Sequence, residues 1–129
     1  MANGFPFTTG AVLSATNMNG LTAFTVGSDQ TADYTAVLAD QYQALIQMNK
    51  ATAVAFKIPT NASVAYPVGT VLTVLNKGVG AVTISAVTSG TTTVLSAGAV
   101  AASPTLAQYK TAACIKTATD TWYVVGAVA

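Results

Sequence analysis

Alternating apolar and polar positions mark two neighbouring strands in the middle of the chain. Side chains alternate in character between residues 44 and 49, where Ile46 and Met48 fall on the same face. In the next run, Val54, Phe56 and Ile58 share one face and Lys57 lies on the other. A period of two is the pattern of a half-buried strand. We therefore predict strands at 44–49 and 54–58.

Two later runs, residues 70–76 and 121–125, are apolar on both faces. A strand of this kind is normally covered on both sides. We therefore expect these strands to contribute to the core and to contacts between protomers. The residues expected in these roles are Val71, Leu72, Val74, Leu75, Trp122 and Val124.

Turn signals separate the predicted strands. Tyr66-Pro67-Val68-Gly69 fits a type I turn, with proline second and glycine fourth. Lys77-Gly78-Val79-Gly80 supplies glycines that tolerate positive φ, and a strand at 82–86 follows. This spacing predicts an antiparallel hairpin between residues 70–76 and 82–86.

Further strands are predicted at 91–95, 112–117 and 121–125, with a loop at 99–104. Roughly seven or eight short strands favour an all-β fold, either an antiparallel sandwich or a jelly-roll-like barrel. We place this β-domain at residues 34–129. Residues 40–47 could start a helix, but they fit strand entry better.

Residues 1–33 are predicted to form an extended N-terminal docking arm, with one short helical turn that Ser14 or Thr16 could N-cap and that Gly20 ends. Gly4, Pro6 and Gly10 oppose regular structure there, and 27–30 looks like a linker or turn. The alternative is that the aromatic side chains of this segment pack on the chain's own domain. The residues expected to bind a partner are Phe5, Pro6, Phe7, Val12, Leu13, Met18 and Leu21.

The composition favours association. The chain has 129 residues, enough for one domain, of which 52% are apolar and only 7% charged. Its net charge of +1 gives little protection against self-association, so we expect a homo-oligomer, with a trimer favoured. Scattered lysines without arginine argue against nucleic-acid binding. No apolar run is long enough for a membrane span, and the first residues do not resemble a signal peptide.

The reactive groups of the chain do not assemble into a familiar catalytic set, so we expect a non-enzymatic protein without catalytic residues, cofactor or metal. Histidine is absent, which removes Ser-His-Asp and Cys-His arrangements. A calcium site from Asp29, Asp33 and nearby carbonyls stays open as an alternative. Asp40 is expected in an Asx turn. Cys114 lies in an apolar run and is expected to act as a small buried hydrophobe.

Aromatic side chains could instead stack on a glycan. Each is explained more simply as a core or rim residue. The six candidates are Tyr34, Tyr42, Tyr66, Tyr109, Trp122 and Tyr123. We treat the glycosylation sequon Asn61-Ala62-Ser63 as chance, because the first residues do not resemble a secretory signal.

Two stretches resemble structural proteins of tailed-bacteriophage virions. Residues 5–19 resemble the virion-proximal start of fibre, spike and head-decoration proteins. Segments between Tyr34 and Ile84, including Phe56-Lys57-Ile58-Pro59 and Tyr66-Pro67-Val68-Gly69, are similar to a small virion β-domain. The ending at 116–126 also fits it. The resemblance covers about three quarters of the chain and carries no catalytic residues.

The resemblance implies a virion protein assembled in the bacterial host cytoplasm. Fibres usually carry long repetitive or additional receptor-binding regions, and we recognise none among these 129 residues. We therefore expect a capsid cement or decoration protein that binds the major capsid protein lattice as a homotrimer. The alternative is a small tail or head fibre or spike component that binds a glycan or host receptor.

Overall fold

The computed structural model describes residues 25–96 and 103–129. Within these residues the chain is all-β, as the sequence predicts, with ten strands in two sheets of mixed pairing and one short 3-10 helix. The short helical turn predicted to start at Ser14 or Thr16 and to end at Gly20 lies outside the described residues. So does most of the predicted loop at 99–104.

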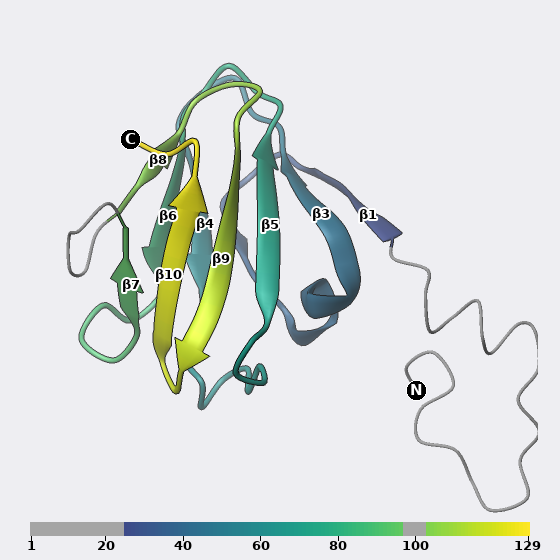
Figure 1. The fold of residues 1–129 in the computed structure, drawn as a ribbon. Coiled ribbons are helices and arrows are strands. Elements are labelled where there is room, and N and C mark those ends of the chain that lie inside the picture. The colour runs from purple at the N-terminus through teal and green to yellow at the C-terminus, as the bar shows by residue number, and fades with distance from the viewer. Residues whose placement is uncertain (1–24, 97–102) are drawn as a thin grey trace, which may run out of the picture.

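The strands form a large sheet and a small sheet that lies behind it (Figure 1). In spatial order, the large sheet contains β1 (Thr25–Gln30), β3 (Gln43–Met48), β5 (Val71–Asn76), β9 (Thr111–Ala118), β10 (Thr121–Gly126) and β7 (Thr93–Leu95). The small sheet contains β2 (Tyr34–Thr35), β4 (Val54–Ile58), β6 (Val82–Ala86) and β8 (Thr105–Leu106). The 3-10 helix η1 (Leu38–Tyr42) leads directly into β3.

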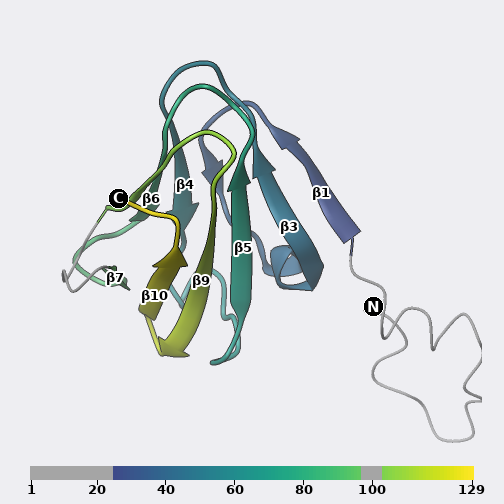
Figure 2. The same cartoon turned by 45° about the horizontal axis from the view of Figure 1, so that its top comes forward.

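Three consecutive strand pairs cross from the large sheet to the small one: β1 to β2, β3 to β4 and β5 to β6. The arcs from β3 to β4 and from β5 to β6 run side by side at the top of Figures 1 and 2. Corresponding strands of successive pairs are parallel in both sheets. The predicted antiparallel arrangement is therefore wrong for this half of the fold. It holds for β9, which is antiparallel to β5 and β10.

The predicted hairpin around residues 77–80 is also wrong, because β5 and β6 belong to different sheets. Gly78 and Gly80 allow the connection between β5 and β6 to pack closely against the connection between β3 and β4. A Cβ on Gly78 would lie 2.2 Å from the carbonyl oxygen of Lys50. The backbone N–H of Gly80 donates to that same oxygen at 3.0 Å. Alternating strands joined by glycines look the same in sequence whether the chain turns within a sheet or crosses between sheets.

Asn76, at the end of β5, fixes this crossing from inside. Its side chain is fully buried and its amide donates to the carbonyl oxygens of Gly80 and Leu106, both at 2.8 Å. Its Oδ1 accepts the backbone N–H of Gly78 at 2.9 Å. A buried amide with these partners avoids the cost of unpaired polar atoms.

The core lies where the alternating pattern predicts it. Side chains from both sheets join one buried cluster, which includes every apolar residue predicted to face inward from the 54–58 strand. The main contributors are Ile46, Met48, Val54, Phe56, Ile58, Leu72, Val74, Val82, Ile84, Cys114, Trp122 and Val124. The shared faces predicted for Ile46 and Met48, and for Val54, Phe56 and Ile58, are confirmed.

The turn before β5 is displaced by one residue from the predicted type I turn. The backbone N–H of Thr70 donates to the carbonyl oxygen of Pro67 at 3.2 Å. Gly69 has a φ of 96° and is the third residue of this turn, as a type II turn requires. The N–H of Gly69 donates across to Lys116 of β9.

β1 occupies the segment predicted to be a linker at 27–30, so that prediction is wrong. β1 pairs in parallel with β3, and the Gln47 side chain donates to the carbonyl oxygen of Gly27 at 2.6 Å. Residues 25–33 therefore belong to the folded part of the chain. The docking interpretation of the arm now concerns residues 1–24, which lie outside the described residues.

Candidate docking face

The outer face of the large sheet carries a continuous apolar row. Val71 of β5 pairs with Ile115 of β9, Ile115 pairs with Tyr123 of β10, and Tyr123 pairs with Leu95 of β7. These positions alternate with buried ones along each strand, so their side chains point away from the core. Val71 and Tyr123 are 44% and 46% exposed.

A second row lies one step along the same strands. Thr73 pairs with Ala113, and Ala113 pairs with Val125, which is 49% exposed. Near the β1 edge, Val26 pairs with Leu45 and is 61% exposed. We call the side chains of both rows, with Val26 and Leu45, the docking face.

The docking face has no charge. In the six strands of the large sheet, all within the described residues, the charged residues are Lys116, which points inward and is 2% exposed, and Asp29 of β1, which forms an ion pair with Lys77 outside the docking face as defined. Contiguous exposed apolar area of this kind commonly marks an interaction site. An uncharged face can be buried without desolvating any ion.

An open groove of about 570 Å³ adjoins the docking face at the start of β5. Its lining includes Gln43, Val68, Val71 and Thr73. Val68 is 63% exposed at the turn that precedes β5. The groove extends the apolar surface beyond the sheet itself, and its polar side chains are amides and hydroxyls.

The predicted core and oligomer residues divide into two sets. Leu72, Val74, Trp122 and Val124 are buried in the core. Val71 and Leu75 point outward, so the expectation that both strands are covered on both sides is not met within the single chain. The seven predicted arm residues, Phe5, Pro6, Phe7, Val12, Leu13, Met18 and Leu21, lie outside the described residues. Sequence reasoning did not single out Ile115, Ala113 and Leu95, although their alternation with buried neighbours was a usable signal.

The aromatic residues are distributed between core and surface. Trp122 is 1% exposed and meets Tyr66 edge-on with ring centroids 5.5 Å apart. Tyr34 stacks on Phe56 and donates its hydroxyl to Asp40 at 2.7 Å. Burial raises the pKa of Tyr66, as it does for Tyr34. The aromatic side chains with exposed rings among the six candidates are Tyr42, Tyr109 and Tyr123.

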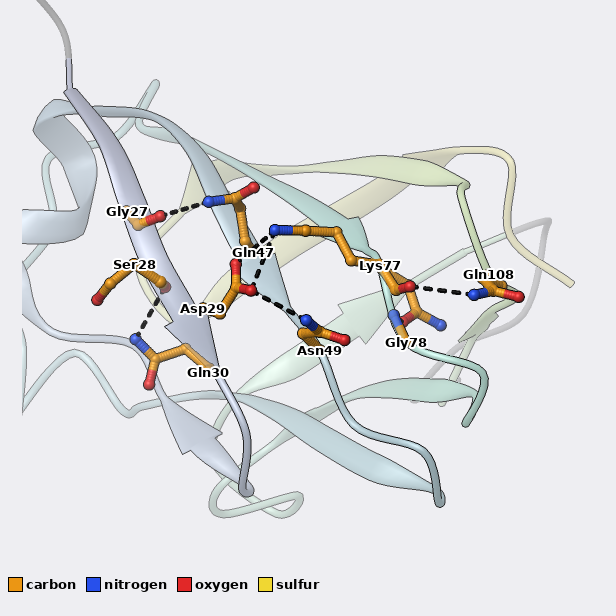
Figure 3. Close-up of polar contacts among 10 residues, drawn as sticks. Gly27, Ser28, Asp29, Gln30, Gln47, Asn49, Lys77, Gly78 and Gln108 are labelled. Carbon is orange, nitrogen blue, oxygen red and sulfur yellow. Dashed lines mark hydrogen bonds and ion pairs between the residues drawn. The ribbon is translucent and has the colours of Figure 1, made fainter.

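Each of the four carboxylates has a local structural partner. Asp29 forms an ion pair with Lys77 at 2.8 Å and accepts a hydrogen bond from Asn49 (Figure 3). These contacts, with that of Lys77 the largest, lower the pKa of Asp29. Asp33 accepts the backbone N–H of Ala55 at 3.0 Å. The described residues contain no group of three or more side chains suited to hold a metal ion.

Asp40 and Asp120 organise turns. Asp40 is buried and accepts the backbone N–H of Val37 at 2.9 Å, which caps the start of η1. This bond runs to a residue three positions earlier, so it is a helix cap and not the predicted Asx turn. Asp120 accepts the backbone N–H of Asn61 at 2.7 Å and the Thr92 hydroxyl at 3.0 Å. These roles leave the docking face as the feature that calls for a functional explanation.

Cys114 is fully buried in β9, which confirms its predicted role as a small hydrophobe. Burial raises the pKa of its thiol to about 12, so the thiolate required for nucleophilic chemistry is disfavoured.

No protein family, curated protein or solved structure matches the chain. No helix among residues 25–96 and 103–129 is long and apolar enough to cross a membrane.

Proposed function

We propose that this chain is a non-enzymatic structural protein of a tailed-bacteriophage particle. In this proposal it is a capsid cement or decoration protein that binds the major capsid protein lattice as a homotrimer. It assembles in the bacterial cytoplasm and stays on the virion. The observation that carries the structural role is the uncharged, apolar docking face. The virion assignment rests on the resemblance of residues 5–19 and 34–126.

The docking face is suited to contact between copies of the chain. Obligate homo-oligomer interfaces are more hydrophobic than transient ones. Complete burial of a valine, leucine or isoleucine side chain contributes about 1.5–3 kcal/mol. Val71, Ile115 and Val125 lie on adjacent strands, so one flat partner surface covers them together. With a net charge of +1, long-range repulsion between copies is weak.

We also infer a sandwich architecture with an N-terminal arm. The two sheets share one core cluster, and three strand pairs cross between them. The arm precedes β1 at the edge of the large sheet. In this arrangement the arm binds the capsid, and the docking face holds the trimer together.

The test of the docking face is a charge substitution with a matched control. Val125→Asp places a carboxylate on the face, whereas Val79→Asp places one on the exposed 77–81 crossing, where Val79 is 73% exposed. We expect the wild type and Val79→Asp to sediment as the same oligomer and Val125→Asp to dissociate while keeping its circular dichroism. A wild type that is a stable monomer at micromolar concentration would contradict the proposal.

Copy number separates the cement role from the fibre alternative. A cement protein occupies symmetry-related capsid sites to saturation and has no affinity for cell-wall sugars. A few copies at the tail, together with glycan binding, would contradict the cement assignment and support the fibre. Quantitative staining of purified virions, or a particle reconstruction, gives the number directly.

A further inference from the structure

Lys116 is a buried amine that forms no ion pair with any residue of the described ranges. It lies on the inward side of β9 and is 2% exposed. The ion pair found in the described part of the chain joins Lys77 to Asp29 instead. An ammonium group removed from water without a counter-ion is strongly destabilising. The burial of Lys116 therefore needs a chemical explanation.

The Lys116 amine contacts two carbonyl oxygens. Its Nζ lies 2.5 Å from Oδ1 of Asn61 and 2.6 Å from the backbone oxygen of Tyr66. Asn61 lies in the connection between β4 and β5 and is 55 residues away from Lys116 in sequence. The tertiary fold therefore brings together a primary amine and a carboxamide.

The geometry is close to that of a reacting pair. A carbonyl oxygen lies about 1.2 Å from its carbon, so Cγ of Asn61 lies within about 3.7 Å of Nζ (2.5 Å plus about 1.2 Å). Bound reactants are well placed for attack at about 3–3.5 Å. A side-chain movement of a few tenths of an ångström brings Nζ of Lys116 to this distance from Cγ of Asn61.

We propose that Lys116 and Asn61 form an intramolecular isopeptide bond. The neutral amine of Lys116 attacks Cγ of Asn61, forming the Nζ–Cγ bond. The Cγ–Nδ2 bond breaks, and the nitrogen leaves as ammonia with a proton taken from Nζ. If Lys116 starts as an ammonium group, its additional proton is transferred to the released ammonia, which leaves as ammonium ion. The products are one secondary amide and one released ammonia, and no oxidant, metal or cofactor is consumed.

The surroundings favour this product. Trp122 pairs with Lys116 across β9 and β10, and Tyr66 packs edge-on against Trp122. Burial beside these rings penalises a charge. Formation of the amide removes the charge of Lys116 and keeps an N–H that can donate to a carbonyl oxygen. The reaction therefore relieves the cost that the buried ammonium imposes.

Asp120 is a positioning residue for the reaction. Its Oδ1 accepts the backbone N–H of Asn61 at 2.7 Å and the Thr92 hydroxyl at 3.0 Å. It has a φ of 54° in the tight turn between β9 and β10. Asp120 thus ties the Asn61 connection to the strand pair that contains Lys116. Its removal should slow bond formation by increasing the freedom of Asn61.

The test is the intact mass of the full-length protein. We expect the denatured wild type to be lighter than its sequence mass by one ammonia. Trypsin cleaves after unmodified lysine, so the bond should protect Lys116 and yield residues 58–77 joined to residues 111–129. An intact mass equal to the sequence mass, with free cleavage at Lys116, would overturn the proposal.

Variants identify the atoms involved. Asn61→Ala and Lys116→Met should each restore the mass expected from their sequence. Asn49→Ala is the matched control, because Asn49 also lies beside a lysine-containing contact but one with Asp29 as counter-ion. It should retain the full ammonia loss. Asp120→Ala should accumulate the linked form more slowly after synthesis, followed by mass against time.

A succinimide at Asn3-Gly4 or Asn19-Gly20 would lose the same ammonia. Tandem mass spectrometry of the tryptic peptides separates the two modifications. A mass loss confined to residues 1–50, without a joined peptide, would overturn the assignment to Lys116 and Asn61.

Discussion

Gly80 lies so close to Thr52 that a Cβ on the glycine would fall 1.9 Å from the threonine carbonyl oxygen. The two residues belong to successive crossings between the sheets, and neighbouring backbone bonds hold the crossings together. Val54 donates its N–H to Ala81 at 3.1 Å, and Lys77 donates to Met48 at 2.7 Å. Gly80 does not have a positive φ, so its backbone conformation does not require a glycine. A glycine is required at this position because there is no space for a Cβ atom.

Gly80→Ala should destabilise the protein, because the added methyl must displace backbone atoms. Overpacking of this kind costs about 1–3 kcal/mol in the free energy of unfolding. Gly90→Ala is the matched control, since nothing lies within 4 Å of its Cβ position. Urea denaturation compares the two. Equal stability of both variants would show that the crossings separate easily, contrary to the structure.

Trp122→Ala should reduce the free energy of unfolding by about 3–5 kcal/mol, the usual range for a large buried aromatic. Trp122 is 1% exposed and packs on Tyr66. Tyr123→Ala, the next residue on the exposed side of β10, should cost the monomer far less. A loss below about 1 kcal/mol for Trp122→Ala would mean that the core tolerates its removal, and would refute this placement.

Stability should fall at alkaline pH because of the buried Tyr66 and the partly buried Tyr34. Burial, followed by the charge and hydrogen bonding of Asp40, raises the pKa of Tyr34 above its ordinary 10.0. Burial and the charge of Asp40 also raise the pKa of Tyr66. When the pKa of a group is higher in the folded state than in the unfolded state, the group stabilises the fold fully at a pH below its unfolded-state pKa. This stabilisation is lost as the pH rises from the unfolded-state pKa through the folded-state pKa.

Melting temperatures measured from about pH 8 to about pH 11 should therefore decline above about pH 10. The double variant Tyr34→Phe, Tyr66→Phe should flatten this decline. Tyr109→Phe should not, since Tyr109 is 77% exposed. If the melting temperature of the double variant falls as steeply as that of the wild type, groups other than Tyr34 and Tyr66 cause the decline.

Removal of residues 1–21 should leave the β-fold intact. It should abolish binding of the added protein to virions that were assembled without it. The truncated chain starts at Thr22 and keeps β1. A chain that starts at Thr31 is the contrast, because it also loses the Asp29–Lys77 ion pair and the strand that pairs with β3. We expect the first to melt near the full-length temperature and the second to melt lower. If the chain that starts at Thr22 still occupies all the virion sites, the arm is not the anchor and the β-domain makes the capsid contact.

Local pattern predicted which side chains face the core but not which strands are neighbours. Val54, Phe56 and Ile58 are buried as their period of two requires. β5 and β6 follow each other in sequence, yet β5 pairs with β3 and β9, and β6 pairs with β4 and β8. β1 escaped prediction because Gly27, Ser28 and Asp29 disfavour strands. Its strand conformation comes from pairing with β3.

The candidate sites divide in the same way. Val71 was expected at a contact surface from its own strand, and it lies on the docking face. Ile115 and Leu95 join it only through cross-strand register. The Lys116–Asn61 contact depends on a 55-residue separation that no local motif reports. Asn61 stood out in the sequence only as part of a sequon.

The irregular pairing of β1 has a consequence for how this protein avoids uncontrolled polymerisation. β1 is the outermost strand of the large sheet, and its register with β3 shifts twice, at Thr25/Val26 and between Val26 and Asp29. A straight, regular outer strand is a template on which foreign strands add without limit. A chain with so few charges has little electrostatic means of preventing such growth. The distorted outer strand, with a carboxylate at Asp29, makes strand addition there unfavourable and so limits fibril growth from that end of the sheet.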